Sequence, residues 1–565
     1  MIDLRSLWDI ALILIFALAA APFFGDYLAR VYTNRPAFGD VLLGPIERAI
    51  YRALGTSPRR SMPAREYMGA ILLVNGAVLG FMFWYFVQQA SLPFNPTGIP
   101  NMSWDLAFHS AASFTTNTDY THFTNEEQIS FGAMMIAWQL ALFLSAATGL
   151  SVLAASVRGF MSRDGTLGNF YVDIVRTLTR VLLPISIVAA LVLVIMGVPE
   201  TFNWTVLAHP ITGGTQTIYL GPVASFQSIS LLGTNGGGWY SANMVDPLAN
   251  PSAVSNLFAI FVMLLIPLSA PFAFARMVRR KGEEWPYIGT ILIILVVALA
   301  LFIVYQSATN PALANLTGLS QTNGYPVGQE TRFSLPEASM FQVVSVYSNV
   351  GANNMMIGAL SPVGQMVLLF GMFTQSTPGG EGTGFGMLLL FAVLAIFVGG
   401  LMVGRTPEYL GKKIETGHVK WSALALLIHP ALILIPTAVA ILGGFVVVDG
   451  STVGLSAHNL TSVVYEFTSE SANNGSALST AAFNDTTPFF NVAGAIVMLV
   501  GRFLPIYAML KVSEKFARQR TLPAGPGTLR TASGTFTIYF TLFLVITTAL
   551  LFLPVLALGP LAQIL

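Results

Sequence analysis

The sequence predicts an all-α polytopic membrane protein with ten transmembrane regions, from its composition and from its apolar stretches. Of the 565 residues, 54% are hydrophobic and only 9% are charged, whereas soluble domains carry about 25% charged residues. Apolar stretches of about 20 residues, long enough to cross a bilayer core of about 30 Å, recur along the whole chain. The ten regions lie at residues 8–28, 67–89, 131–157, 174–197, 254–276, 286–306, 363–404, 421–448, 490–512 and 533–560.

The composition also excludes several functions. The net charge is +1 and no basic cluster is interleaved with aromatic residues, so membrane lipid is the expected surrounding and nucleic acid is not a partner. The absence of cysteine excludes disulfides, thiolate metal sites and cysteine nucleophiles. The six histidines show no close metal-ligand spacing along the chain, so redox chemistry is not expected. They are His109, His122, His209, His418, His429 and His458.

The seventh region differs from the others because it is about 40 residues long and contains a break that no uninterrupted helix would choose. Non-helical backbone survives at membrane depth only where protein buries it or where it lines a wet cavity, so the break is a candidate gating loop. The alternative is a surface loop between two shorter helices. The break consists of Thr377, Pro378, Gly379, Gly380, Glu381, Gly382, Thr383 and Gly384.

The distribution of Lys and Arg predicts the orientation. Of the 27 such residues, 24 lie in segments that the positive-inside rule places in the cytoplasm, at 30–65, 158–180, 276–281, 405–420 and 511–530. The long segments between them hold a single one, Arg332, and are therefore expected to face outward, as is the N-terminus. These outward segments are 90–130, 199–253, 307–362 and 449–489.

The outward segments form a fourfold repeat. Each contains a semi-apolar stretch of about ten residues, too short to cross the membrane, that runs into a cluster of Thr, Ser, Asn and Gly. Aligning one asparagine of each cluster (Asn117, Asn235, Asn349, Asn474) gives separations of 118, 114 and 125 residues. We therefore expect four helix–pore-helix–filter–helix repeats around one pore, at 66–158, 171–277, 285–404 and 420–512, with extra helices at 1–35 and 531–565.

The clusters can form a selectivity filter. Extended Thr-Asn-Gly backbone presents rows of carbonyl oxygens, which together can replace the hydration shell of a monovalent cation. For a single cluster, a turn between helices is an equal alternative, but four clusters in phase favour the filter. Acidic residues near the outer mouth would concentrate cations there, namely Asp119, Glu126, Glu127, Asp246, Glu466 and Glu470. The predicted filter residues are Thr116, Asn117, Thr118, Thr234, Asn235, Gly236, Gly237, Ser348, Asn349, Val350, Gly351, Asn473, Asn474 and Gly475.

One arginine lies inside an apolar region. Arg502 follows about a dozen apolar residues, and a charge at membrane depth is costly and by default functional. Behind a cation filter, it would act as a pore or cavity charge that opposes free passage. The alternative is an arginine that extends to the cytoplasmic headgroups.

Enzyme signatures are absent from the sequence. It contains no G-x-x-x-x-G-K-[ST], no Asp-Lys-Thr-Gly phosphorylation sequence, no H-E-x-x-H and no G-x-S-x-G. No cytoplasmic segment exceeds about 40 residues, which is too small for a nucleotide-binding domain. A membrane-embedded enzyme that uses His429 with Glu408 or Glu415 is the alternative, although neither acid is expected at membrane depth.

Four stretches carry a resemblance to a known family. They are 404–414 (Gly-Arg-Thr-Pro-Glu-Tyr-Leu-Gly-Lys-Lys-Ile), the second filter at 233–238 (Gly-Thr-Asn-Gly-Gly-Gly), the first filter at 116–118 and the fourth filter region at 465–477. On these residues, and over its whole length, the chain resembles the KdpA family, the potassium-binding subunits of Kdp potassium-transporting ATPases.

The resemblance implies a fold similar to that of potassium channels, with a filter that captures extracellular K⁺, the transported ion. It implies an ATP-driven uptake pump in the cell membrane, in which this chain binds no nucleotide. Its partners would be a P-type catalytic subunit (KdpB), a single-span subunit (KdpC) and often a small hydrophobic peptide (KdpF). The segment 377–384 resembles the family's gating loop, and Arg502 matches its intramembrane arginine.

The sequence departs from the family in two filters. The first commonly continues Asn-Trp-Gln, where this chain has Asp119-Tyr120-Thr121. The third usually has Ser-Cys-Gly, where this chain has Ser348-Asn349-Val350, so its register is open. A self-standing potassium transporter of the Trk/Ktr class shares the fourfold unit and is the alternative function.

Overall fold

The computed structural model describes residues 4–211, 213–308, 328–448, 451–452, 456–478, 487–521, 523 and 529–564. Within them, ten helical segments are long and apolar enough to cross a membrane, which confirms the predicted number. Their main helices are α1 (Leu4–Tyr32), α3 (Ala64–Gln88), α6 (Gln139–Met161), α8 (Leu183–Ile195), α10 (Ala253–Val278), α11 (Trp285–Ser307), α15 (Thr383–Met402), α16 (Thr416–Leu442), α18 (Pro488–Ala517) and α19 (Gly534–Leu558).

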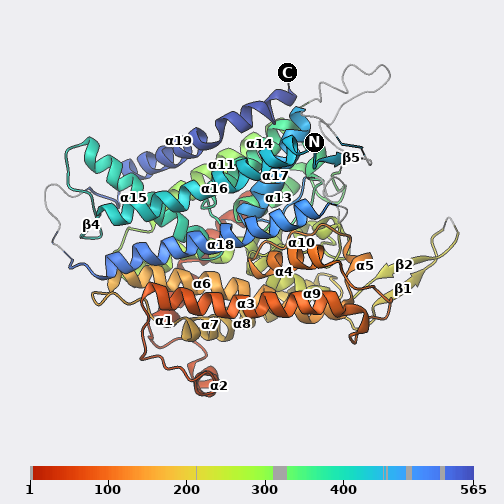
Figure 1. The fold of residues 1–565 in the computed structure, drawn as a ribbon, viewed down its shortest axis with the longest axis horizontal. Helices are drawn as coiled ribbons and strands as arrows, with labels where there is room; N and C mark the ends of the chain where they lie inside the picture. The colour runs from red at the N-terminus through yellow and green to blue at the C-terminus, as the bar shows by residue number, and fades with distance from the viewer. Residues whose placement is uncertain are drawn as a thin grey trace.

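Two of these segments include a π-helical turn. The third begins with η2 (Ala133–Trp138), and the fourth consists of α7 (Phe170–Arg176), η3 (Thr177–Leu182) and α8. Figure 1 shows the long helices running roughly parallel to one another. The apolar core lies between them.

The predicted seventh region is divided between two helices. A short helix, α14 (Pro362–Thr374), precedes α15, and the backbone between them is not helical. This follows from the sequence, since Pro378 and the glycines after it do not support a continuous helix. Residues 376–382 are all buried, so the break is not a surface loop. Buried irregular backbone of this kind is what the sequence predicts for the break.

Four short helices lie between the long ones, and their packing closes a circle. They are α4 (Trp104–Thr115), α9 (Val223–Leu232), α13 (Leu335–Tyr347) and α17 (Ala457–Ser471). Each short helix packs against a helix from the preceding repeat, namely the one that follows that repeat's own short helix in the chain. Thus α6 packs on α9, α10 on α13 and α14 on α17, while α18, the last of the series, returns to pack on α4.

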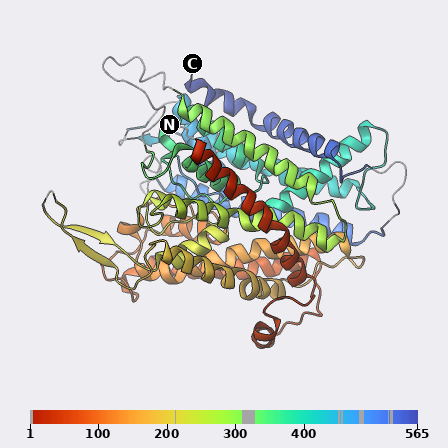
Figure 2. The same ribbon diagram turned by 180° about the vertical axis from the view of Figure 1, so that it is seen from behind.

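The first and the last long helix pack against the helices of these repeats. Helix α1 packs along α10, where the backbone at Gly25 approaches Phe272 so closely that a side chain at this position would overlap it. Helix α19 packs on α11 and α14. Seen from behind in Figure 2, α1 crosses the face of the helices that it covers.

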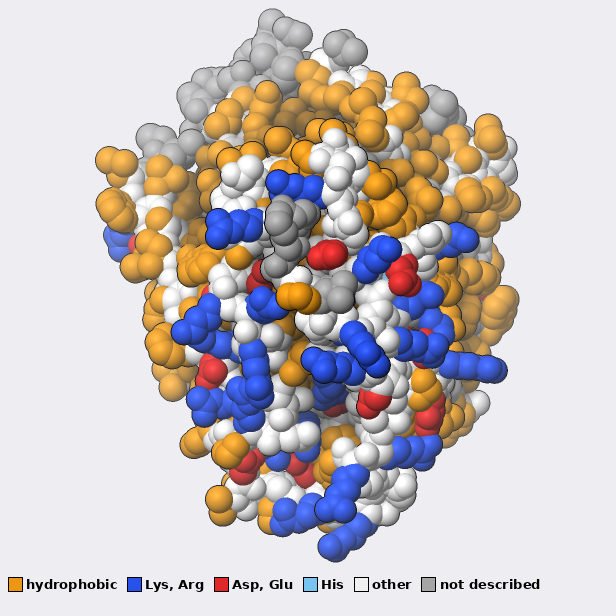
Figure 3. All heavy atoms as spheres, turned by 90° about the vertical axis from the view of Figure 1, so that its left-hand side faces the viewer, with side chains coloured by type: hydrophobic (Ala, Val, Ile, Leu, Met, Phe, Trp, Pro, Cys, Tyr) orange, Lys and Arg blue, Asp and Glu red, His pale blue; other side chains and the backbone are white. Residues whose placement is uncertain are grey.

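The basic residues gather at one end of the molecule. Figure 3 looks onto this end, at the left of Figure 1, and shows Lys and Arg side chains spread across it. The segment 404–414 lies here and forms the hairpin of β3 (Glu408–Tyr409) and β4 (Lys412–Lys413). Lys412 Nζ donates to the carbonyls of Gly159, Ser162 and Phe516, so it caps the C-terminal ends of α6 and α18 together.

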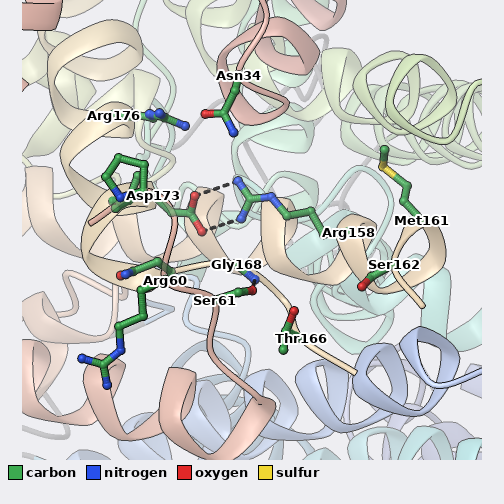
Figure 4. Close-up of a pocket in the computed structure, with 13 residues that line it drawn as sticks. Asn34, Arg60, Ser61, Arg158, Met161, Ser162, Thr166, Gly168, Asp173 and Arg176 are labelled. Carbon is green, nitrogen blue, oxygen red and sulfur yellow. Dashed lines mark hydrogen bonds and ion pairs between the residues drawn. The ribbon is translucent and has the colours of Figure 1, made fainter. Parts of the chain in front are cut away.

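A pocket with a volume of about 290 Å³ lies at the same end, bordered by the chain after α1, the end of α6 and α7. Figure 4 shows the residues that line it. Arg158 binds Asp173 through two hydrogen bonds of 2.7 and 2.8 Å, and this ion pair joins α6 to α7. Arg60 and Arg176 also line the pocket. The amphipathic helix α2 (Asp40–Ala53) contacts α7 nearby.

The opposite end carries the loops of the predicted outward segments. The hairpin of β1 (Thr205–Ala208) and β2 (Gln216–Tyr219), with Thr205 opposite Tyr219, projects beyond the helices in Figures 1 and 2. Residues 1–3, 309–327 and 479–486 lie outside the described residues. The remaining short elements are α5 (Asn125–Gln128), η1 (Gln89–Ser91), η4 (Asn243–Val245), η5 (Ile357–Ala359), η6 (Leu561–Gln563), β5 (Val447–Val448) and β6 (Ser451–Thr452).

Candidate functional site

Each short helix is followed by a loop that one serine holds in place. In the first, the backbone N–H of Thr118 donates to the carbonyl of Ser113 (3.0 Å). The hydroxyl of Ser113 donates to the carbonyl of Tyr120 (2.8 Å). The equivalent serines are Ser230, Ser345 and Ser469, which accept the same backbone bond from Asn235, Val350 and Asn474. Counting from these serines defines four equivalent loops, numbered one to four: 116–122, 233–239, 348–354 and 472–478.

The backbone conformation gives the same register. Each loop has two residues with positive φ, two positions apart: Asn117 and Asp119, Thr234 and Gly236, Asn349 and Gly351, Asn473 and Gly475. The alignment of the asparagines is therefore wrong by one residue in the second and fourth loops, where Thr234 and Asn473 match Asn117. Side-chain identity misled that alignment, because the serine bonds and backbone angles determine which residues are equivalent. In the third loop, whose register the sequence left open, Asn349 is the residue equivalent to Asn117.

The loops contact one another in a closed ring, which we call the four-loop ring. A β-carbon at Gly236 would overlap the carbonyl of Val350 in the third loop. A β-carbon at Gly351 would overlap the carbonyl of Asn474 in the fourth loop, and one at Gly475 would overlap the carbonyl of Thr118 in the first. Glycine is required at these positions by both the positive φ and the close approach.

The remaining contact, between the first and second loops, uses side chains. Asn117 Nδ2 donates to the carbonyls of Thr234 (2.8 Å) and Gly233 (3.1 Å). Asp119 Oδ2 accepts from the backbone N–H of Gly237 (3.2 Å). We call the four contacts seams 1/2, 2/3, 3/4 and 4/1, after the loops that they join.

Asp119 occupies a position that sequence reasoning missed. It was expected at the outer mouth, but it lies in the ring, where the other three loops have glycine. Its side chain is buried, and its Oδ1 has no hydrogen-bond partner among the described residues. The departure of Asp119-Tyr120-Thr121 from the family pattern was the available signal, but the equivalence with glycine appears only once the register is known.

The predicted gating loop lies against the ring. The Glu381 carboxylate accepts from the hydroxyl of Thr234 and from Asn117 Nδ2 (3.4 Å), so it touches two loops at once. The backbone N–H of Glu381 donates to the Thr234 hydroxyl (3.0 Å), and that of Gly379 donates to the carbonyl of Tyr347 (2.8 Å). Pro378, Gly380, Gly382, Thr383 and Gly384 lie in the same buried stretch and the first turn of α15.

Arg502 faces the gating loop and not the headgroups. Its side chain is 7% exposed, and one guanidinium nitrogen lies 3.5 Å from Glu381 Oε1, whose side chain is fully buried. The guanidinium also donates to the hydroxyl of Thr383 (3.2 Å) and to the carbonyl of Ser145 (3.3 Å). A buried ion pair therefore lies beside the ring, and the interpretation of Arg502 as a residue that extends to the headgroups is wrong.

Three other predicted filter residues lie in the same loops. The Thr116 hydroxyl bonds to that of Thr118 (2.8 Å). Asn235 Oδ1 accepts from the hydroxyl of Ser145 in α6 (3.0 Å), so its side chain points away from the next loop. Ser348 ends α13 and is fully buried.

Two of the acids expected at the outer mouth are also buried. Glu470 lies 3.1 Å from His109 and Glu466 lies 2.7 Å from His122. The histidines were not expected to act together, because they are thirteen residues apart in sequence. The acids do not face an open mouth.

The groups of the alternative enzyme do not meet. His429 Nδ1 is 2.9 Å from the hydroxyl of Ser471. Glu415 caps the start of the same helix, fourteen residues and therefore about 21 Å earlier. Glu408 lies in β3 at the basic end.

The comparisons with known proteins agree over almost the whole chain. Residues 11–565 match the family described as "Potassium-transporting ATPase A subunit", KdpA. Two curated proteins named potassium-transporting ATPase potassium-binding subunit come from Nostoc sp. and Gloeobacter violaceus. The first is 38% identical over 564 residues, 99% of this chain and 98% of the relative. The second is 39% identical over 563 residues, 97% of this chain and 96% of the relative.

A solved structure shares the fold. The potassium transporter TrkH from Vibrio parahaemolyticus superposes with a TM-score of 0.51 at 16% sequence identity, over 90% of this chain and 98% of that one. This likeness confirms the predicted all-α polytopic fold class. Together with the ten apolar helices and the family match, it shows that the chain is a multi-pass membrane protein that belongs to the KdpA family of potassium-transporting ATPase A subunits.

Proposed function

We propose that this chain selects extracellular K⁺ at the four-loop ring and passes it to a P-type catalytic subunit, which supplies the energy of ATP. The observation that carries the proposal is the closed circle of loops in which the carbonyls of Thr118, Val350 and Asn474 lie against their neighbours. Backbone carbonyls fixed in this way can replace the hydration shell of K⁺. The names of the curated relatives support K⁺ as the ion.

In this proposal, the filter consists of the four loops, and the repeats have the boundaries given by the sequence. The buried segment 377–384 is the gating loop, because Glu381 bonds to two loops on one side of the ring. Arg502 places a fixed positive charge there, which opposes free passage of cations. Its ion pair with Glu381 holds the loop in place, so that ion movement requires the loop to shift.

The ring side of the molecule would face outward, and the basic end would face the cytoplasm of the cell in whose membrane the protein lies. The gathering of Lys and Arg in Figure 3 supports this orientation, which also places the N-terminus outside. The chain would be the non-catalytic subunit beside KdpB, with KdpC and KdpF as further partners. It contains no nucleotide-binding motif of its own.

The deciding experiment measures K⁺ uptake and K⁺-stimulated ATP hydrolysis in a strain that lacks other potassium transporters. This chain alone is compared with this chain plus a Kdp catalytic subunit. We expect uptake only with the partner, in step with hydrolysis. Uptake by the chain alone, driven by the membrane potential without ATP consumption, would make it a self-standing transporter and overturn the proposal.

The role of Arg502 has a separate test. Arg502→Ala removes the positive charge beside Glu381, so we expect K⁺ to leak back and the number of K⁺ ions moved per ATP to fall. Arg518→Ala is the matched control, because Arg518 is 67% exposed and pairs only with Glu514 among the described residues. An unchanged ratio of K⁺ to ATP in Arg502→Ala would remove the role assigned to this charge.

A further inference from the structure

Four ionisable side chains lie together behind seam 4/1. They come from α4 (His109), the end of the first loop (His122) and α17 (Glu466 and Glu470), and none is more than 2% exposed. They form two pairs, with 3.1 Å between His109 Nε2 and Glu470 Oε1 and 2.7 Å between His122 Nε2 and Glu466 Oε1. The two imidazole rings are stacked with their centres 3.9 Å apart.

The hydrogen bonds around His122 fix its tautomer. Asn491 Nδ2 donates to Asp105 Oδ2 (2.9 Å), so the amide oxygen of Asn491 must face His122. That oxygen lies 2.7 Å from His122 Nδ1, which therefore carries a proton and donates it. The remaining nitrogen, Nε2, points at Glu466. A histidine whose far N–H is held by an amide or carboxylate is the usual arrangement for a metal ligand.

The charges of the cluster suit one divalent cation. Two buried carboxylates are neutralised either by protons, held on the acids or on the imidazoles, or by a cation between them. One divalent cation balances both carboxylates and leaves both imidazoles neutral. The cluster also has unused ligand atoms, since His109 Nδ1 and Glu470 Oε2 have no hydrogen-bond partner among the described residues.

The equivalent positions at seam 2/3 show that the fold does not require ionisable side chains behind a seam. Counting from Ser113 and Ser345, Phe341 stands in the place of His109 and Asn354 in the place of His122. Counting from Ser469 and Ser230, Gln227 stands in the place of Glu466 and Leu231 in the place of Glu470. Asn256 keeps the place of Asn491, and its Oδ1 accepts from Asn354 Nδ2 (3.1 Å). The scaffold is shared, but only seam 4/1 carries the ligand-type side chains.

We propose that His109, His122, Glu466 and Glu470 bind one divalent transition-metal ion, with Zn²⁺ the best match. His109, His122 and Glu470 each offer a ligand atom within 4.8 Å of the others, and Glu466 lies next to His122. Two imidazole nitrogens and two carboxylate oxygens are a ligand set that suits Zn²⁺ in four-coordinate geometry. Binding releases the protons that the two acid–base pairs share.

The metal ion would link α17 to α4 across seam 4/1. The Tyr120 hydroxyl donates to Glu466, and the Tyr120 carbonyl accepts from the serine that holds the first loop. The site is therefore connected to the first loop through Tyr120 as well as through His122 itself. Because its ligands are buried, the ion enters during folding and exchanges slowly afterwards.

The test is the metal content of the complex, purified through a tag without histidine from cells supplied with Zn²⁺. We expect about one zinc per chain by mass spectrometry of the elements. The variant H109F/H122N/E466Q/E470L, which gives seam 4/1 the residues of seam 2/3, is expected to carry essentially none. His458→Asn is the matched control and keeps its zinc, because His458 lies at the surface and contacts Gln563.

A second measurement guards against misfolding of the fourfold variant. The single variant Glu470→Gln preserves shape, and it is expected to lose most of the zinc while it elutes as a monodisperse complex. In cells supplied with Co²⁺, the unaltered complex is expected to show the visible absorption of four-coordinate cobalt, and Glu470→Gln is expected to lack it. Unaltered protein without zinc or cobalt, or equal metal in the unaltered and variant proteins, would overturn the proposal.

Discussion

Seams 2/3 and 4/1 of the ring use the same backbone contact but different surroundings. At both, a glycine with positive φ lies against the carbonyl of the next loop, Gly236 against Val350 and Gly475 against Thr118. Behind seam 2/3, the neutral amides of Asn256 and Asn354 bond to each other. Behind seam 4/1, the corresponding places hold histidines and carboxylates.

This difference separates what closes the ring from what supports it. Ring closure depends on backbone shape, which three of the four seams reproduce with glycine. The supporting layer depends on side-chain chemistry, and it varies although the helices around it are equivalent. Buried amides need only hydrogen-bond partners, whereas a buried carboxylate must also be neutralised, by a proton or by a cation. We therefore expect the two seams to respond alike when a ring glycine is enlarged. We expect them to respond differently when a hydrogen-bonding side chain of the supporting layer is removed.

The largest effect is expected from the ring glycines. Gly236→Ala and Gly475→Ala each push a β-carbon into the next loop's carbonyl, so we expect K⁺ uptake to fall on the order of a hundredfold or more at either seam. Gly76→Ala on α3 is the control, since a β-carbon there meets nothing within 4 Å. Uptake that survives at one seam would show that the two are not equivalent in shape.

The second-largest effect is expected on stability, when the equivalent asparagines Asn491 and Asn256 are each replaced by alanine. Asn491→Ala leaves the His122 N–H and the Asp105 carboxylate without their partner, and we expect a loss of about 3 kcal/mol of stability. Asn256→Ala leaves only neutral groups unpaired, with an expected loss of about 1.5 kcal/mol. Thermal unfolding of the purified protein measures both, with the exposed Asn203→Ala as control. Equal losses would mean that the charged layer adds nothing to the scaffold.

The smallest effect concerns seam 1/2, where Asp119 replaces glycine. Asp119→Asn keeps an oxygen for the N–H of Gly237 but removes the ionisable carboxyl group from the ring. We expect the apparent affinity for K⁺ to weaken about tenfold, which corresponds to about 1.4 kcal/mol. The concentration dependence of K⁺-stimulated ATP hydrolysis is the measurement. An unchanged affinity would show that the carboxylate shapes the loop without acting on the ion.

Much of the fold could be predicted from the sequence because lipid imposes a simple rule. Every crossing segment must be long and apolar, so ten of them could be counted directly. The break in the seventh region could be located from Pro378 and its glycines. Its burial against the ring could not, since that depends on contacts with residues more than a hundred positions away, such as Thr234.

The sequence predicted the four loop clusters of the site, but it did not predict which residues of the four loops are equivalent. Loops of equal composition recur, so the four clusters stood out, but asparagine occurs at two adjacent positions of the fourth cluster and the choice between them was arbitrary. The serine bonds decide it, and they are visible only in three dimensions. The pairs of His109 with Glu470 and of His122 with Glu466 were hidden for the same reason, because their members are more than three hundred residues apart.

That one chain supplies all four quarters of the ring has a consequence for its evolution. In a pore assembled from four copies of one gene product, any mutation appears four times around the axis. A carboxylate such as that of Asp119 would then appear four times, and the four side chains would repel one another when ionised. With internal repeats, each quarter can change alone, so inheritance can keep three glycines for shape while the fourth position takes on a separate task.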